Sequence, residues 1–541
     1  MHQMKEGAVM SFRENQNQQF KMTDSLNALT TREQKALQNS WAKVFADEVF
    51  PSIDEKRFSV IYSDKDSRPN TPVNIIVGAL IIKELFGYSD DDMVEGLMLD
   101  SRLQYALHTT SFDEQPLSDK TLSRFRKRCY EYETLHNVDL YRDCIKDLSG
   151  KIAKMMKING SIKRMDSMMI ESNIRLLSRM ELIYTCISKL VGYLMKKAVA
   201  GIPEILKPYA DPNNYNRVFH HQKSVGRDEL IRRLLTDSDL LLEICGTAYE
   251  DVTEYELFVR CLSEQTIEEN GKRRLRTKED ATMDSGSLQN PSDPDATYRK
   301  KSGKSYRGYT ANIEESVGEN GSIVTDYRYE PNIYSDSQFL QDSMAEAESH
   351  ETETTLITDG GYAGGDNILL AREKNVRLIT TALVGKDAPD IFADFEFNDD
   401  GTKLLKCAAG HAPKSCSYIE PTGQCRVSFN KELCFGCQHR EQCNPKIGMR
   451  VAAFITSKNA SDRAKHQRYM HNEEFKDYAR LRNGVETIPS NLRRNYDLET
   501  LPRGKQRGKF FFGCKVAALN FRKLFNFRRE SCCYAKNPIL T

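Results

Sequence analysis

Two carboxylates that lie far apart in the chain occupy positions where α/β proteins often carry chemistry. Asp166 falls in the segment 161–170, whose apolar residues alternate at period two, so a carboxylate is expected in mid-strand. Asp359 follows the short strand expected over 354–358 and precedes two glycines. A sharp turn at a strand end is where open α/β sheets usually bind ligands. A buried carboxylate is costly unless it is paired or bound to a metal, so Asp166 in particular needs a partner.

A third acid belongs to a helix expected over 462–488. Tyr478, Arg482 and Glu486 step by four and therefore share one helix face. We expect Pro489 to end this helix, which leaves Glu486 in its last turn. Three acids that meet in space would bind two divalent ions, an arrangement used for in-line attack at phosphodiesters.

Each of these acids also has a purely structural interpretation. Asp359 would serve as a turn cap, and Asp166 would pair with a Lys or Arg of a neighbouring hairpin. Arg482 and Glu486 would form a surface salt bridge, as most such pairs do. Whether the three acids meet in space decides between the two interpretations.

The cysteines are distributed unevenly. Of 14 in the chain, six fall between Cys407 and Cys443, in a polar segment that has too few apolar residues to build its own core. Clustering of this kind in a reducing cytosol indicates metal binding rather than disulfides. We expect four of the cysteines to bind one structural Zn²⁺, with an iron–sulfur cluster or free thiols as the alternatives. The expected ligands are Cys407, Cys434, Cys437 and Cys443.

Charge is balanced over the chain, with 78 Lys and Arg against 77 Asp and Glu, but it is not balanced locally. Between Arg493 and Arg529 there are eleven basic residues and two acids, which indicates a polyanion-binding end; a solvated charged face is the alternative. A second basic cluster lies on a helix that begins near Ser118. Its members are Arg124, Arg126, Lys127 and Arg128, and we expect them to place this helix against a DNA duplex and so to make residues 71–150 a DNA-binding domain.

The elements that position these residues suggest several units. Residues 1–70 are weakly patterned, and 71–150 predict a compact all-helical domain. A mixed α/β sheet domain is expected over 160–400 with 460–530: it contains the carboxylate-bearing strand, a hairpin with its turn at 318–321, and alternating helices and strands. A helical insertion (175–265), a polar linker (268–297) and the Cys-rich insertion (400–450) complete it.

Several segments carry a resemblance to a known family. The stretches RMDSMMIESNI (164–174), ITDGGYAGGDN (357–367) and RNGVETIPSNLRRNY (482–496), followed by RGKFFFGCKVAALNF (507–521), resemble the DDE-type transposases of bacterial insertion sequences. The helical stretches PVNIIVGALIIKELFGYSDDDMVEGL and LSDKTLSRFRKR resemble the amino-terminal domain of the same family. The resemblance spans residues 70 to 530, with its motifs in the family's order.

The resemblance implies an RNase H-like catalytic domain in which Asp166, Asp359 and Glu486 hold two Mg²⁺ ions. It also implies DNA contacts by Tyr478, Arg482, Arg493 and Arg494, although Tyr478 is displaced by one residue from the family spacing and Arg493 stands where Lys is usual. Arg can still contact phosphate, and it does so bidentately.

The expected function is that of a transposase. It would bind the ends of its element as double-stranded DNA, cleave them and join the freed 3′-hydroxyls to target DNA, as an oligomer that brings two ends together. A nuclease that only hydrolyses, and a non-catalytic zinc-containing DNA-binding protein, are the alternatives.

The hydropathy pattern bears on the expected cellular location of the protein. The longest apolar run, 75–82, is far shorter than the roughly 20 residues that a membrane-spanning helix needs. The first ten residues show no apolar signal core. We therefore expect a cytoplasmic protein without a membrane partner.

Overall fold

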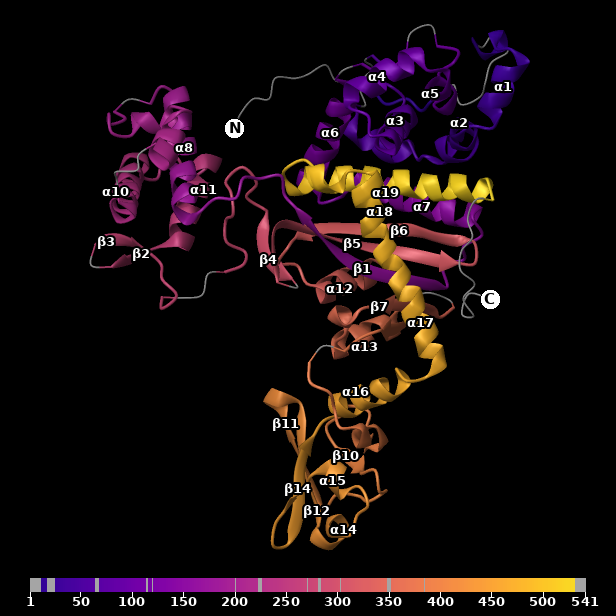
Figure 1. Ribbon diagram of the computed structural model, residues 1–541, viewed down its shortest axis with the longest axis vertical. Coiled ribbons are helices and arrows are strands. Elements are labelled where there is room, and N and C mark those ends of the chain that lie inside the picture. Colours follow the sequence, from indigo (N-terminus) through magenta and orange to yellow (C-terminus); the bar gives the residue numbers. More distant parts are fainter. Residues whose placement is uncertain are drawn as a thin grey trace.

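The computed structural model describes residues 11–16, 25–63, 68–112, 115–118, 120–199, 201–221, 226–269, 271–280, 284–301, 303–347, 352–383 and 385–530. A helical module lies against one face of a central mixed sheet, and two smaller units project from it, one to the side and one at the far end (Figure 1). Within the described part of the chain, no helix is long and apolar enough to cross a membrane.

The central sheet runs β6–β5–β1–β7–β8, with β4 pairing with the first residues of β5. β1 lies antiparallel to β5 and parallel to β7, and β7 is parallel to β8. The strands are β1 (Ile162–Glu171), β4 (Thr297–Lys301), β5 (Lys304–Gly318), β6 (Gly321–Pro331), β7 (Thr354–Thr358) and β8 (Val376–Thr380). Helices α12 (Asp336–Glu346) and α13 (Gly365–Glu373) lie between successive strands. The predicted mixed α/β architecture is confirmed.

The helical module is larger than the sequence pattern indicated. It contains α1 (Thr31–Gln38), α2 (Trp41–Val44), α3 (Val73–Phe86), α4 (Asp90–Leu99), α5 (Ser101–Ala106), α6 (Thr121–His136) and α7 (Leu140–Met155). Phe45, Phe50 and Phe58 are fully buried in it. The module thus begins well before residue 71, where the sequence pattern placed its start. Between α2 and α3 the chain runs through short 3₁₀ and π turns, which have no helical periodicity to recognise.

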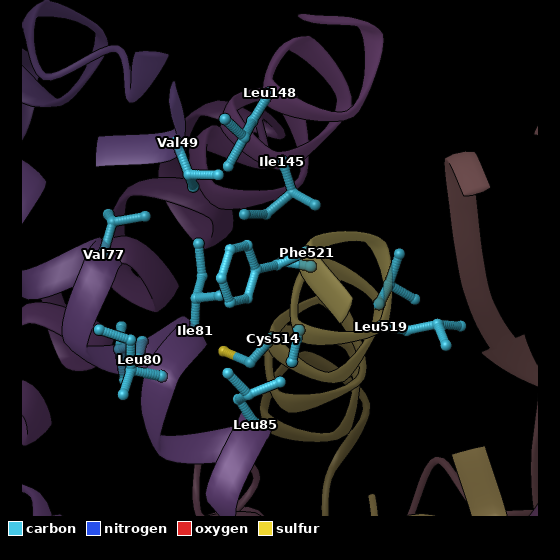
Figure 2. Packing of buried hydrophobic residues seen from close by; sticks show 14 of the residues in the cluster. Val49, Val77, Leu80, Ile81, Leu85, Ile145, Leu148, Cys514, Leu519 and Phe521 are labelled. Atoms are coloured by element: carbon cyan, nitrogen blue, oxygen red, sulfur yellow. The ribbon is translucent and has the colours of Figure 1, made fainter. Parts of the chain in front are cut away.

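One helix from the far end of the chain completes this module. Helix α19 (Lys505–Arg528) packs between α3 and α7 on one side and β6 on the other. Helix α3 is buried along Val73–Leu85 because neighbours cover it on several sides. Figure 2 shows the shared core, to which α3 contributes Val77, Leu80, Ile81 and Leu85, α7 contributes Ile145 and Leu148, and α19 contributes Cys514, Leu519 and Phe521.

The lateral unit is a helical insertion with its own core. Helices α8 (Arg179–Lys196), α10 (Arg227–Cys245) and α11 (Thr253–Gln265) bury Ile187, Leu190 and Phe258 among one another. Part of the segment expected to be a polar linker instead forms a hairpin, β2 (Thr266–Glu269) with β3 (Lys272–Leu275). Such short, charged strands are hard to distinguish from a loop by pattern.

The distal unit holds the cysteine cluster. Its sheet runs β11–β12–β14–β13 and is followed by α16 (Lys458–Tyr469), which returns to the central domain. The elements are β9 (Glu396–Phe397), β10 (Leu404–Lys406), β11 (Ser415–Ile419), β12 (Gln424–Asn430), α14 (Lys431–Phe435), α15 (Arg440–Cys443), β13 (Lys446–Ile447) and β14 (Val451–Thr456).

The helix expected over 462–488 is instead divided. Helix α16 ends at Tyr469, and α17 (Glu473–Asn483) continues through a 3₁₀ turn at Gly484–Glu486 into α18 (Thr487–Asn495). The expectation that Pro489 ends the helix is wrong. Pro489 lies in the first turn of α18, where a backbone N–H has no intrahelical acceptor, so its missing donor costs nothing.

Candidate active site

Asp166 lies in the middle of β1, and the alternating pattern predicted this mid-strand position. It pairs with Ile313 across β1 and β5, and only 12% of its side chain is exposed. The backbone N–H of Ser167 donates to Asp166 Oδ1 at 2.9 Å, which fixes the carboxylate against its own strand.

Asp359 follows β7 on the parallel neighbour of β1 and caps the turn after it. The N–H of Gly361 donates to Asp359 Oδ1 at 2.8 Å, while 31% of the side chain stays exposed. The capping interpretation is therefore correct, but it leaves the second carboxylate oxygen free to face a ligand.

One guanidinium contacts all three acids. Arg482 Nη2 lies 3.3 Å from Asp166 Oδ1 and 3.9 Å from Asp359 Oδ2, and Nη1 donates to Glu486 Oε1 at 2.6 Å. Glu486 is the most open of the three acids, with 63% of its side chain exposed. A strand, a strand end and a helix thus bring their acids around a single cation, and the site opens to solvent on the Glu486 side.

The electrostatics of the site are dominated by burial. Burial raises the pKa of Asp166, and the nearby Asp359 charge adds to this, while Arg482 opposes it. Repulsion by the Asp359 carboxylate thus acts on the Asp166 pKa in the same direction as desolvation, and desolvation is the larger cause.

The donor set suits a hard divalent cation. Carboxylate oxygens are the ligands that Mg²⁺ prefers, and three carboxylates from three elements contact the Arg482 guanidinium. In the described residues, no three His, Cys, Asp or Glu side chains lie close enough together to hold a metal ion as they stand. A divalent cation and the Arg482 guanidinium would therefore compete for the same carboxylates.

Two further residues support this site, and the sequence reasoning did not single them out. Asn312 of β5 donates both to the backbone oxygen of Asp166, at 3.3 Å, and to the hydroxyl of Tyr362. Tyr362 is fully buried, and its pKa is raised by burial first and then by the charges of neighbouring acids that include Asp166 and Asp359. The only signal available for Tyr362 was its place directly after the Gly-Gly pair.

The basic cluster on α6 is only partly available to a ligand. Arg124 and Lys127 are exposed, and Arg128 lies half-buried over the ring of Tyr62, 4.9 Å from its centroid. Arg126 instead is 9% exposed and forms an ion pair with Asp90 inside the module. Its charge is neutralised there, so Arg126 is poorly placed to contact DNA.

Of the other residues expected to contact DNA, one is buried and two are exposed. Tyr478 is 7% exposed and packs in a small core with Phe475 and Leu481, away from solvent. Arg493 and Arg494 are exposed on α18. Arg493 Nη2 donates to the backbone oxygen of Met169, at 3.2 Å, and thereby connects α18 to the strand that carries Asp166.

The four expected zinc ligands line one small cavity in the distal unit. Cys407, Cys434, Cys437 and Cys443 surround a space of about 20 Å³, with His411 and His439 at its edge. Burial first, and then the charges of the other three sulfurs, raise the pKa of Cys443 to about 11. The N–H of His439 donates to Cys437 Sγ at 3.4 Å, a bond that orients this sulfur. Cys416 and Cys425 lie outside the cavity, and Cys532 and Cys533 fall outside the described residues.

Comparisons with known proteins identify the class. Residues 32–128 match the family described as a transposase domain (DUF772), and residues 406–525 match the family described as a transposase DDE domain. These two matches cover separate parts of the chain and support a DDE-type transposase of the insertion-sequence kind. The second match contains the cysteine cluster, Arg482 and Glu486, whereas Asp166 and Asp359 lie outside both. No curated protein matches the chain.

Among solved structures, the piggyBac transposase synaptic complex with hairpin DNA aligns with 94% of this chain and 83% of its own. The sequence identity is 9% and the TM-score is 0.27, which is too low to support a shared fold or function.

Proposed function

We propose that this transposase binds the ends of its insertion sequence as double-stranded DNA, cleaves them with two Mg²⁺ ions and joins the freed 3′-hydroxyls to target DNA. The observation that carries the proposal is the convergence of Asp166, Asp359 and Glu486 on Arg482. Surface salt bridges do not explain it, because Asp166 is buried in mid-strand and Arg482 reaches it from a helix more than 300 residues further along the chain.

The topology supports an RNase H-like catalytic domain. Three antiparallel strands, β1, β5 and β6, come first in the chain, and β7 and β8 then extend the sheet in parallel on the other side of β1. Such an arrangement places a carboxylate of the central strand beside one at the end of its parallel neighbour. Asp166 and Asp359 hold these two positions.

The roles of the side chains follow from their surroundings. Asp166, Asp359 and Glu486 would hold the ions, which when bound activate the attacking water or 3′-hydroxyl and stabilise the leaving oxygen. Ser167 and Gly361 orient the two aspartates by donating their N–H groups. In the absence of metal, the Arg482 guanidinium balances the carboxylate charge, and it is placed to contact a phosphate once metal takes over that task.

DNA would be held by two basic surfaces. The first comprises the available residues of α6, Arg124, Lys127 and Arg128, and the second comprises Arg493 and Arg494 beside the acids. The contact of Arg493 with the strand that carries Asp166 supports a role in holding the DNA backbone near the reacting phosphate. A homo-oligomer on DNA is expected because two element ends must be joined in one event.

A structural Zn²⁺ in the distal unit is the second part of the proposal. Four thiols around one small cavity, in a unit with a modest apolar core, are the features of a closed tetrahedral zinc site. The ion would link α14 and α15 to the loop that carries Cys407 and so hold the unit together.

A strand-transfer assay tests the central claim. Purified protein, Mg²⁺ and a labelled duplex that carries the element end should give end cleavage and, with target DNA, joined products. Cleavage without joining would favour the hydrolytic nuclease. Binding without cleavage in Mg²⁺ or Mn²⁺ would favour the non-catalytic DNA-binding alternative.

A further inference from the structure

A fourth carboxylate lies beside the proposed active site. Asp336 is the first residue of α12, and it is 8% exposed. Its Oδ1 is buried and accepts a hydrogen bond from none of the described residues. A favourable helix dipole contributes only about 0.3–1 kcal/mol, which does not offset the cost of burying an unpaired carboxylate. Asp336 therefore lacks a partner that its environment demands.

The geometry of Gly361 shows where this carboxylate points. A Cβ on Gly361 would lie 2.7 Å from Asp336 Oδ2 and 3.1 Å from Asp359 Oδ1. Both carboxylates thus approach one point, and the missing side chain of Gly361 is what leaves room for them. The charges of Asp336, Asp166 and Asp359 all act on the hydroxyl of Tyr362, Asp336 most strongly.

The position of Asp336 is fixed by the fold. Buried Asn367 donates to Ser337 Oγ at 2.9 Å and to the backbone oxygen of Tyr362 at 2.8 Å, and it accepts from Gln341 Nε2 at 3.1 Å. These bonds hold the first turns of α12 against the turn that follows Asp359. A carboxylate held this firmly without a partner is typical of a group whose partner is a bound ion.

We propose that Asp336 is a fourth carboxylate ligand of the divalent ion that Asp359 holds. The inference rests on the proposed function, because that function brings the ion. Arg482 supplies a cation to the other three acids, and none of its contacts in the described structure reaches Asp336. The ion would thus neutralise the one acid of the group that Arg482 leaves unbalanced.

Mn²⁺ binding to the full-length protein tests the inference, because this ion prefers carboxylate oxygen to thiolate and is measured directly by electron paramagnetic resonance. Asp336→Asn keeps the shape of the side chain and removes its charge, and we expect it to weaken Mn²⁺ binding about 10- to 100-fold, the effect typical of losing a group that supports a metal site. Asp342→Asn is the matched control. Asp342 lies on the same helix and accepts from the Tyr334 hydroxyl at 2.5 Å, so this change should leave Mn²⁺ affinity unaltered.

Thermal unfolding in EDTA separates ligation from a structural role. Removing an unpaired buried charge should leave the melting temperature of Asp336→Asn equal to or above that of the wild type, whereas a structural role would lower it. Gly361→Ala provides a second variant, because its Cβ must displace the Asp336 carboxylate while all four acids remain. It should also weaken Mn²⁺ binding.

The outcomes distinguish the two proposals. If Asp359→Asn loses Mn²⁺ while Asp336→Asn and Gly361→Ala bind it as tightly as wild type, Asp336 is not a ligand and the proposed function stands. If the wild type binds no Mn²⁺ at carboxylate sites, the proposed function fails and the inference fails with it.

Discussion

Arg482 Nη2 lies 3.3 Å from Asp166 Oδ1, so the cation that partners the mid-strand carboxylate comes from α17 and not from the neighbouring hairpin. The hairpin residue Glu314 is itself bound by Lys163 of β1, at 2.8 Å. Helix α17, which contributes Arg482, and the 3₁₀ turn after it, which contributes Glu486, therefore complete a site begun on the sheet. The metal-free site is held together by the same residue that we expect to contact DNA.

Asp359→Asn should abolish strand cleavage and leave binding of the element end nearly unchanged. The amide keeps the cap to Gly361 but cannot hold a divalent ion, and we expect the rate to fall by at least about 10²-fold, the scale of losing one preorganised electrostatic group. Cleavage on denaturing gels and mobility shifts on the same DNA measure the two quantities. Equal loss of both would mean that Asp359 supports the fold rather than the reaction.

Asp166→Asn should stabilise the metal-free protein at neutral pH. Burial raises the pKa of Asp166, so the folded state retains the proton longer than the unfolded state does. Wild-type stability should then fall as pH rises from the unfolded pKa through the raised folded pKa, and the asparagine variant should lack this fall. Urea unfolding in EDTA at a series of pH values measures the difference. A variant that is less stable than wild type at neutral pH would refute the prediction, whereas added Mg²⁺ should stabilise the wild type alone.

Cys437→Ser should lower the zinc content from about one ion per chain, measured by elemental analysis of the purified protein. Cys425→Ser is the control, because this buried thiol lies near the backbone oxygen of Thr402, at 3.3 Å, and outside the cavity of the four cysteines. Zinc content that falls equally in both variants would indicate general unfolding of the distal unit, and unchanged content in Cys437→Ser would place any ion elsewhere.

Replacing Arg124 and Lys127 together by alanine should weaken binding of the element end and flatten its salt dependence. Each lost phosphate contact reduces the slope of log affinity against log salt by about 0.9. Both side chains are exposed, so the melting temperature should not change. Filter binding in the full-length protein at several salt concentrations is the measurement, because α19 completes the core of this module and an isolated fragment would lack it.

Arg126→Ala should behave in the opposite way. Its guanidinium is paired with Asp90 inside the module, and removing it leaves that carboxylate only Lys83, 3.6 Å away, as a cationic partner. We expect a loss of about 1–3 kcal/mol in unfolding free energy and little change in the salt slope. A flatter dependence of DNA affinity on salt, with unchanged stability, would show that Arg126 contacts DNA after all.

The sequence was informative where one local pattern determines one element. The alternation around Asp166 predicted a strand, and the turn glycines after Asp359 predicted a strand end, because both signals lie within a few residues. The family resemblance assigns Tyr478 to DNA and helical spacing places it on one face with Arg482, but its orientation depends on the core formed with Phe475 and Leu481, which neither signal reveals.

The supporting residues of the site could not be predicted for the same physical reason. Asn312, Asp336 and Asn367 come from β5, α12 and α13. The role of each depends on groups that other elements bring close to it in the fold. Likewise, the four basic residues of α6 look equivalent in sequence. Only the position of Asp90 separates Arg126 from its neighbours.

Helix α19 also determines when the amino-terminal module can finish folding during translation. Lys515 forms a buried ion pair with Glu84 at 2.7 Å across 431 residues of chain, and it belongs to the helix that fills the core of the amino-terminal module. Contacts this distant in sequence form late in folding, because the entropy cost of closing a long loop comes before the stabilising contact is made. While the ribosome is still translating the middle of the message, the amino-terminal helices therefore lack their final packing partner. A stop codon or frameshift anywhere before α19 would therefore also leave the apolar core of the amino-terminal module exposed. Such truncated chains would be degraded by proteases and would not compete with the intact protein for DNA.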